Sequence, residues 1–113
     1  MALLTFSFQE ETPTYYSPSY LIKNSDRFIQ ENEIIIVEGY YDENAVEGGG
    51  IVDYYQDVGS GEVTNVLKLN YENVLNHSTK LIPNVKLLFT GKLAIDPSNP
   101  LAIIFEATEI KSA

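Results

Sequence analysis

VKLLFTGKLAID at residues 85–96, PSNP at 97–100 and LAIIFEATEI at 101–110 together predict two long strands joined by a tight turn. In the first of these segments apolar and polar residues alternate, which is the period of a half-buried strand. The apolar positions are Val85, Leu87, Phe89, Leu93 and Ile95. Gly91 falls in the middle of that face, where a glycine is favoured if the strand bends sharply or another backbone comes close. A long strand with a central glycine therefore suits the corner of a small closed barrel.

Size and composition limit the class of protein. With 113 residues the chain is long enough for one domain with a core of its own. It contains no cysteine, which excludes disulfides and thiolate metal sites. The first ten residues lack a basic segment followed by an apolar run, and no stretch has the apolar length that spans a bilayer. We therefore expect no signal peptide and no association with a membrane.

The negative charge is concentrated in the first half of the chain. Residues 1–62 hold twelve acids and two bases, which is −10, whereas residues 63–113 hold four acids and five lysines, which is +1. Most non-specific affinity for nucleic acid comes from neutralising phosphates. The chain alone is therefore expected to bind single-stranded DNA weakly or not at all. Solubility is the first explanation of the acidic half, and a basic protein partner is the second.

A first long strand is predicted at residues 33–41. Three isoleucines and a valine in this segment are β-branched and favour strand over helix. Gly39 falls on the uncharged face of this strand, as Gly91 does on the later one. Two inward glycines strengthen the barrel interpretation, because glycine relieves crowding where a sheet coils tightly.

The remaining elements are shorter. Residues 51–57 and 63–70 are expected to form a hairpin, and residues 71–77 about two turns of helix. Residues 1–32 are expected to be an irregular arm that wraps the domain or docks on a partner. Within that arm, residues 19–28 suit either a short strand or a single helical turn, and the sequence does not choose between them.

The order of these elements is strand, strand, strand, short helix, strand, strand. It is the order of a five-stranded OB-like Greek-key barrel with one short helix between strands 3 and 4. We therefore predict an all-β fold in which residues 1–32 are an N-terminal arm and residues 33–113 are the OB-like barrel domain.

Residues 84–96, NVKLLFTGKLAID, and the polar turn after them resemble part of the smallest OB-fold subunit of the telomere-capping CST complex. That region of the family has a small residue, an aromatic or aliphatic pair, glycine, glutamate or lysine, leucine and a polar turn. The resemblance covers residues 63–110. The small subunit of replication protein A is a more remote match. It implies a nuclear protein that binds a larger OB-fold protein and helps to protect chromosome ends. Those small subunits usually carry a C-terminal helix, which this sequence lacks after Ile110.

No residue pattern points to catalysis or to a cofactor. His77 is the only histidine and is expected to be a surface residue. Asp53 and Asp57 would lie about 13 Å apart on one face of a strand, which is too far for a pair of catalytic carboxylates. The spacing of three loop acids matches no calcium loop; they are Asp42, Glu43 and Glu47. We predict a protein that is not an enzyme and needs no cofactor.

Adjacent tyrosines suggest a surface for nucleic acid. Neighbours in a strand point to opposite faces, and on this alternation Tyr40 and Tyr55 are the exposed members of their pairs. With Lys68 and Lys92 also outward, they would form a small platform on which single-stranded bases stack. The alternative is ordinary tyrosine on a sheet surface, and the acidic neighbours favour that alternative.

Outward aliphatic residues suggest a surface for a protein partner. They are Ile36, Leu88, Ile104 and Ile110. Such a cluster suits an interface, or it is covered by the N-terminal arm. The sequence thus predicts a non-enzymatic small subunit that binds a larger OB-fold partner in a telomere-capping or single-stranded-DNA-binding complex. The alternative function is a β-barrel module that binds a small ligand or a carbohydrate.

Overall fold

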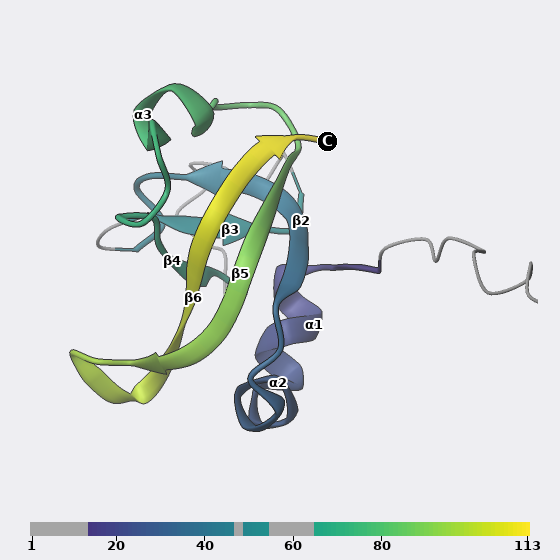
Figure 1. Ribbon diagram of the computed structural model, residues 1–113, viewed down its shortest axis with the longest axis vertical. Coiled ribbons are helices and arrows are strands. Elements are labelled where there is room, and N and C mark those ends of the chain that lie inside the picture. The colour runs from purple at the N-terminus through teal and green to yellow at the C-terminus, as the bar shows by residue number, and fades with distance from the viewer. Residues whose placement is uncertain (1–13, 47–48, 55–64) are drawn as a thin grey trace, which may run out of the picture.

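The computed structural model describes residues 14–46, 49–54 and 65–113. They form one mixed sheet with three short helices around it (Figure 1). The strands are β1 (Tyr15–Tyr16), β2 (Ile35–Asp42), β3 (Gly50–Val52), β4 (Leu67–Asn70), β5 (Leu87–Asp96) and β6 (Asn99–Ser112). The helices are α1 (Pro18–Lys23), α2 (Ser25–Glu31) and α3 (His77–Lys80).

Five of the strands close into a ring because β2 is shared between two neighbours. Its residues Tyr40 to Asp42 pair antiparallel with β3, and Ile35 to Gly39 pair antiparallel with β5. Around the ring the order is β2, β3, β4, β6, β5, and β4 runs parallel to β6. The prediction of an all-β, barrel-like sheet is confirmed at this level.

The core fills the inside of this ring and also receives side chains from the helices. Phe89 and Phe105 are fully buried at its centre. Leu21 of α1 and Phe28 of α2 belong to the same buried cluster. Of the two alternatives left open for residues 19–28, the structure shows helix, and the helices α1 and α2 are longer than the single turn expected within the irregular arm. The division between residues 1–32 and 33–113 stays a prediction.

Gly91 lies where the backbone of β6 comes close to β5. A side-chain carbon at this position would collide with the carbonyl oxygen of Glu106 and lie 2.8 Å from the Cα atom of Ala107. The pairing register shifts at the same point, since Thr90 pairs with Glu109 and Gly91 with Ala107. The expectation that another backbone approaches Gly91 is confirmed.

Gly39 also leaves no room for a side chain, because a Cβ there would lie 2.7 Å from the carbonyl oxygen of Val52.

The register shift reverses the predicted facing of Ile110. One extra residue, Thr108, is inserted in β6 opposite the Thr90–Gly91 step. A one-residue bulge turns every later side chain to the other face. Ile110 therefore points into the core and is 1% exposed, where an outward position was predicted.

The ends of the predicted inward face of β5 are exposed. Val85 precedes the strand and is 40% exposed. Ile95 is 50% exposed, because it lies where the β5–β6 hairpin extends past the pairings with β2 and β4. The core positions Leu87, Phe89 and Leu93 are buried as predicted.

Candidate functional site

A groove of about 410 Å³ opens on the outside of the barrel, where β1, β2 and the residues after β3 meet. We call it the tyrosine groove. Its lining residues are Tyr15, Tyr16, Ser17, Ser19, Glu38, Tyr40, Asp53, Tyr54 and Lys86. They converge because β1 pairs with Ile36 and Val37 of β2, while Tyr40 of β2 pairs with Val52. The sheet thus gathers four tyrosines from three separate segments.

One wall of the groove is fixed by the core. The ring of Tyr16 makes an edge contact with Phe28, at 5.0 Å between centroids, and stacks on Tyr20 at 5.6 Å. The chain turns into α1 directly after β1, where the Ser17 hydroxyl accepts a hydrogen bond of 3.2 Å from the Tyr20 amide. This is an ordinary N-cap. The cap and the ring contacts hold Tyr15 and Tyr16 at the groove edge.

The acidic groups of the groove are held from two sides. Asp53 accepts a hydrogen bond of 3.0 Å from the backbone amide of Ser19, in the first turn of α1. That bond ties the residues after β3 to the helix. Glu38 lies 4.0 Å from the ammonium group of Lys86, and both side chains are partly exposed. Such a loose surface pair contributes little to stability.

The groove therefore offers aromatic faces, hydroxyl groups and two carboxylates, against one ammonium group. Tyr54 is 59% exposed and Tyr15 44%, so their rings are accessible. Aromatic faces stack on planar or cationic groups, and carboxylates accept hydrogen bonds from them. The arrangement suits the binding of a ligand with planar donors.

The residues predicted to contact nucleic acid do not come together. Tyr40 lines the tyrosine groove, whereas neither Lys68 nor Lys92 does. Lys68 donates a hydrogen bond of 2.7 Å to Asp96, and Lys92 lies directly across from Glu106 in the β5–β6 pairing. Tyr55 lies outside the described residues.

Tyr54 was predicted to point inward, and that was wrong, because β3 ends at Val52 and its alternation does not continue.

Most of the residues predicted to bind a partner are buried within the chain itself. Leu88 is 5% exposed and Ile104 is 6% exposed, while Ile36 is half-buried. Ile110 is part of the core. The outward position predicted for Ile110 was therefore wrong. Leu88 and Ile104 are covered, which was the alternative to an interface, and their coverage by the N-terminal arm stays a prediction.

Asp96 joins the start of the β5–β6 turn to β4. Its two carboxylate oxygens accept hydrogen bonds from Lys68 at 2.7 Å and from the amide and hydroxyl of Ser98 at 3.0 and 2.9 Å. These bonds, with that from Lys68 the strongest, lower the pKa of Asp96 from 3.8 to about 2. The sequence placed Asp96 in the turn but carried no signal for its pairing with Lys68, which is 28 residues away.

Tyr41 lies in a second aromatic group that sequence reasoning did not identify. Its ring meets Tyr71 edge-on at 6.4 Å, and Tyr71 lies 4.7 Å from His77. Burial, with Tyr71 close by, raises the pKa of Tyr41 from 10.0 to about 12. Gly49, at φ +89°, lies against the Tyr41 ring, and a side chain there would strike the hydroxyl. This group packs the loop before β3 against the segment before α3.

Within the described part of the chain, no three histidine or acidic residues gather as a metal site would require. Asp42 Oδ1 accepts a hydrogen bond of 3.0 Å from the Asn44 amide, and Glu47 lies outside the described residues. None of the described helices has the length and apolar character needed to cross a membrane. Comparison with known proteins found no matching family model and no matching curated protein.

Proposed function

We propose that this protein is a non-enzymatic OB-fold module that acts as the small subunit of a nuclear complex at chromosome ends or on single-stranded DNA. In this role it binds a larger OB-fold protein, and it contacts DNA weakly or only through the complex. The observation that carries the proposal is the strand ring, together with the resemblance of residues 84–100 to the telomeric small subunits.

The strand ring supports the OB assignment by its pairing order. In an OB fold a Greek-key barrel of five strands is closed through its first strand. Here β2 pairs with both β3 and β5, and the parallel pair β4–β6 completes the circuit. The short helix α3 lies between the third and fourth strands of the ring, although it spans His77–Lys80 and the helix predicted over residues 71–77 was wrong for residues 71–76, which form turns and irregular backbone.

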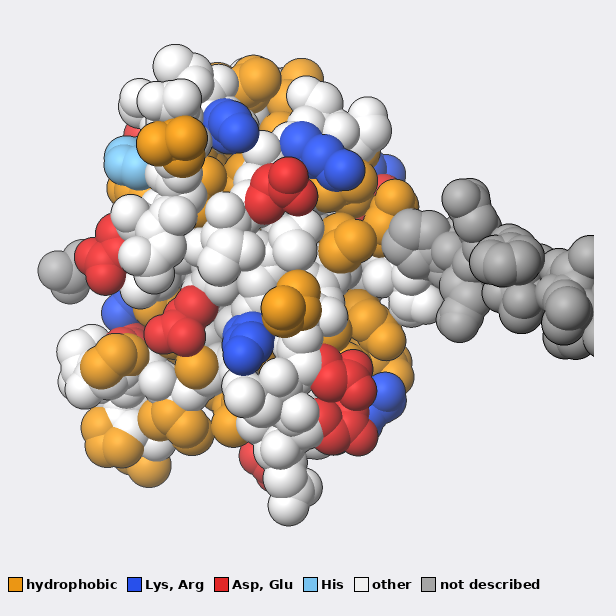
Figure 2. Space-filling view, in the orientation of Figure 1, with side chains coloured by type: hydrophobic (Ala, Val, Ile, Leu, Met, Phe, Trp, Pro, Cys, Tyr) orange, Lys and Arg blue, Asp and Glu red, His pale blue; other side chains and the backbone are white. Residues whose placement is uncertain are grey.

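An apolar hairpin tip on this chain favours a protein partner. The tip consists of the turn between β5 and β6 and its flanking residues, and it projects from the barrel (Figure 1). Leu101 is 95% exposed and Ile95 50%, and Pro97 and Pro100 are also exposed. Apolar side chains gather at this end of the molecule (Figure 2). A contiguous exposed apolar patch is typical of an interface.

Charge argues against strong direct binding of DNA by the chain alone. The net charge is −9, and Lys68 is engaged with Asp96. We expect an isolated chain to bind an oligothymidine weakly or not at all at physiological salt, as measured by fluorescence anisotropy. Sub-micromolar affinity would contradict this part of the proposal.

The proposed subunit role is tested by affinity capture from native cells with Leu101→Asp as the variant. The wild-type chain is expected to retain a larger OB-fold protein, and the variant to lose at least about 90% of it, because an interface charge is desolvated without a pair. The matched control is Leu75→Asp, since Leu75 is 78% exposed and lies before α3, away from the hairpin tip.

Two outcomes would overturn the proposal: a chain that is a monomer in native extract, or equal retention of the partner by wild type and Leu101→Asp. Leu88→Asp and Ile104→Asp do not serve here, because both side chains are buried and these changes would unfold the barrel.

A further inference from the structure

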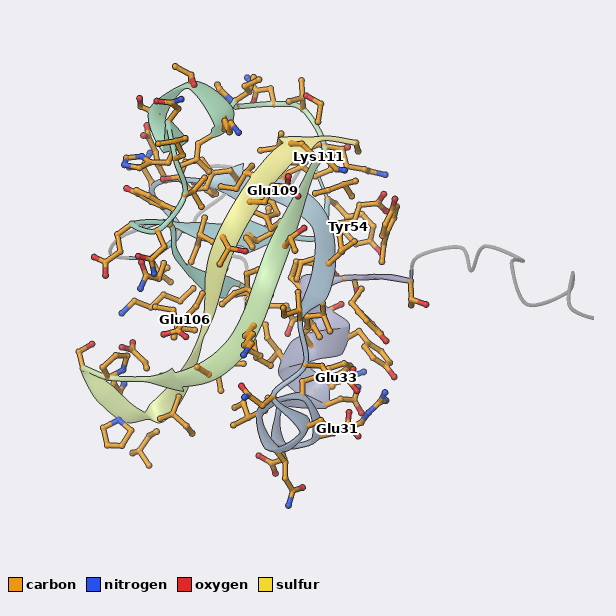
Figure 3. The ribbon with its side chains drawn as sticks, viewed as in Figure 1. Glu31, Glu33, Tyr54, Glu106, Glu109 and Lys111 are labelled. Carbon is orange, nitrogen blue, oxygen red and sulfur yellow. The ribbon has the colours of Figure 1, made fainter. Side chains whose placement is uncertain are left out.

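The tyrosine groove is separate from the hairpin tip and is not used by the proposed subunit role. Tyr54 lies beside β2, on the side away from β5 and β6 (Figure 3). The groove volume of about 410 Å³ is within the range of ordinary ligand sites. It is larger than a single side chain requires, so it has room for more than one residue or ring.

The groove is largely formed before any ligand binds. Tyr16 is held against Phe28, and Asp53 is held by the Ser19 amide. Asp53 makes no other hydrogen bond within the described residues, so its second oxygen can accept one from a ligand. A preformed site loses less entropy when a ligand binds.

The negative charge of the groove favours a cationic ligand. Glu38 and Asp53 contribute two negative charges, and Lys86 contributes one positive charge that is already close to Glu38. The charged residues of the lining therefore sum to −1. Phosphates are repelled by this field, and a cation is attracted.

The chain shows how such a surface holds a guanidinium group. Arg27 places its guanidinium 4.7 Å from the centre of the Phe28 ring and pairs with Glu31 at 3.5 Å. An aromatic face and a carboxylate thus both contact an arginine of the chain itself. The tyrosine groove presents the same two features, with Tyr54 exposed and Asp53 beside it in sequence.

We propose that the tyrosine groove binds a short arginine-containing peptide segment of a protein partner. The guanidinium stacks on an exposed tyrosine ring and donates hydrogen bonds to the Asp53 carboxylate, and the flanking residues lie along the remaining tyrosines. Arginine suits this better than lysine, because its planar group stacks and donates to a carboxylate at the same time. This inference goes beyond the proposed function, because it concerns another face and requires no telomeric partner.

The test measures binding of a short labelled peptide that contains arginine, and of the same peptide with citrulline in place of arginine. Citrulline keeps the shape and loses the charge. The full-length chain is titrated by fluorescence anisotropy, and amide shifts are followed by NMR. We expect the arginine peptide to bind at least about fivefold more tightly, as a cation–aromatic contact with a carboxylate partner implies. The shifts should centre on Tyr15, Tyr40 and Tyr54.

Four variants separate the groove from general electrostatics. Asp53→Asn keeps an oxygen that can accept from the Ser19 amide, and Tyr54→Ala removes an exposed ring; each should weaken binding about fivefold. Tyr54→Phe keeps the ring and should bind within about twofold of wild type, since the stacking face remains. Glu109→Gln makes the same charge change as Asp53→Asn on β6, away from the groove (Figure 3), and should also leave binding unchanged.

Three results would overturn the inference. The first is equal binding of the arginine and citrulline peptides. The second is equal weakening by Asp53→Asn and Glu109→Gln. The third is binding of oligothymidine or of an oligosaccharide at Tyr40 and Tyr54 in place of the peptide. Leu101→Asp should leave peptide binding intact, so the failure of this inference and the failure of the subunit role are told apart.

Discussion

Gly91 shows how one residue determines the shape of the barrel wall. It occupies the point where β5 and β6 approach too closely for a side chain and where the pairing register shifts. The alternation of β5 predicted that Gly91 faces inward. It carried no information on Thr108, because a bulge depends on the partner strand. For this reason Phe89 was assigned to the correct face and Ile110 was not.

We expect Gly91→Ala to destabilise the protein by about 1–3 kcal/mol, because the added methyl group meets backbone atoms that cannot move independently. The free energy of unfolding from urea denaturation measures this. Lys92→Ala, at the next position in β5, is the control and should change it by less than about 0.5 kcal/mol. Equal stability of Gly91→Ala and wild type would contradict the close approach.

Asp96 makes the stability of the folded state depend on pH in the acidic range. Its pKa is about 2 in the folded chain and 3.8 in an unperturbed carboxyl. A lowered pKa stabilises the folded state at pH values above 3.8, and this contribution is lost as the pH falls from about 4 to about 2. We expect Lys68→Met to raise the pKa of Asp96 toward its ordinary value.

The pKa of Asp96 is measured by NMR titration of its carboxyl carbon, and the stability by urea denaturation across the same pH range. Lys86→Met, which removes only the loose pair with Glu38, is the matched control. The interpretation fails if Lys68→Met leaves the Asp96 titration where it is in wild type.

At the scale of elements, β2 and β5 were predicted best and the helices least well, since α3 (His77–Lys80) shares only its first residue with the helix predicted over residues 71–77. From Ile35 to Tyr40, β2 alternates between buried and half-buried positions, as its β-branched sequence indicates. The sequence signal for α1 was present, since Ser17 is an N-cap and Pro18 stands at the first helical position. The helix is too short for its apolar residues to show a helical period. Leu21 is buried in the core, but this burial depends on the barrel and cannot be read from the local sequence.

Removing the cap of α1 should loosen both the core and the tyrosine groove. We expect Ser17→Ala to lower the free energy of unfolding by about 1 kcal/mol, because the Tyr20 amide loses its acceptor. Urea denaturation measures the loss, and amide shifts report on Tyr15 and Tyr16. Ser78→Ala, at an exposed position of α3, is the control and should change neither quantity.

At the scale of the whole molecule, the order of elements predicted the barrel, but it did not predict which surfaces are free. Leu88 and Ile104 alternate outward in sequence, yet both are buried. The tyrosine groove combines residues from 15 to 86, and none of its long-range contacts is visible as a local pattern. Sequence reasoning identified Tyr40 alone among the groove tyrosines. Tyr40 lies within β2, where the alternation of faces holds, whereas Tyr54 lies beyond the end of β3.

The account depends most on the closure of the five strands through β2. Nuclear Overhauser effects across paired strands in solution test this directly, with the β4–β6 contact between Leu69 and Phe105 as an internal reference. We predict strong cross-strand effects between Val37 and Phe89 and between Ile36 and Thr90, which are paired residues of β2 and β5. If the Leu69–Phe105 contact were observed and both β2–β5 contacts were missing, the sheet would be open and the account would be wrong.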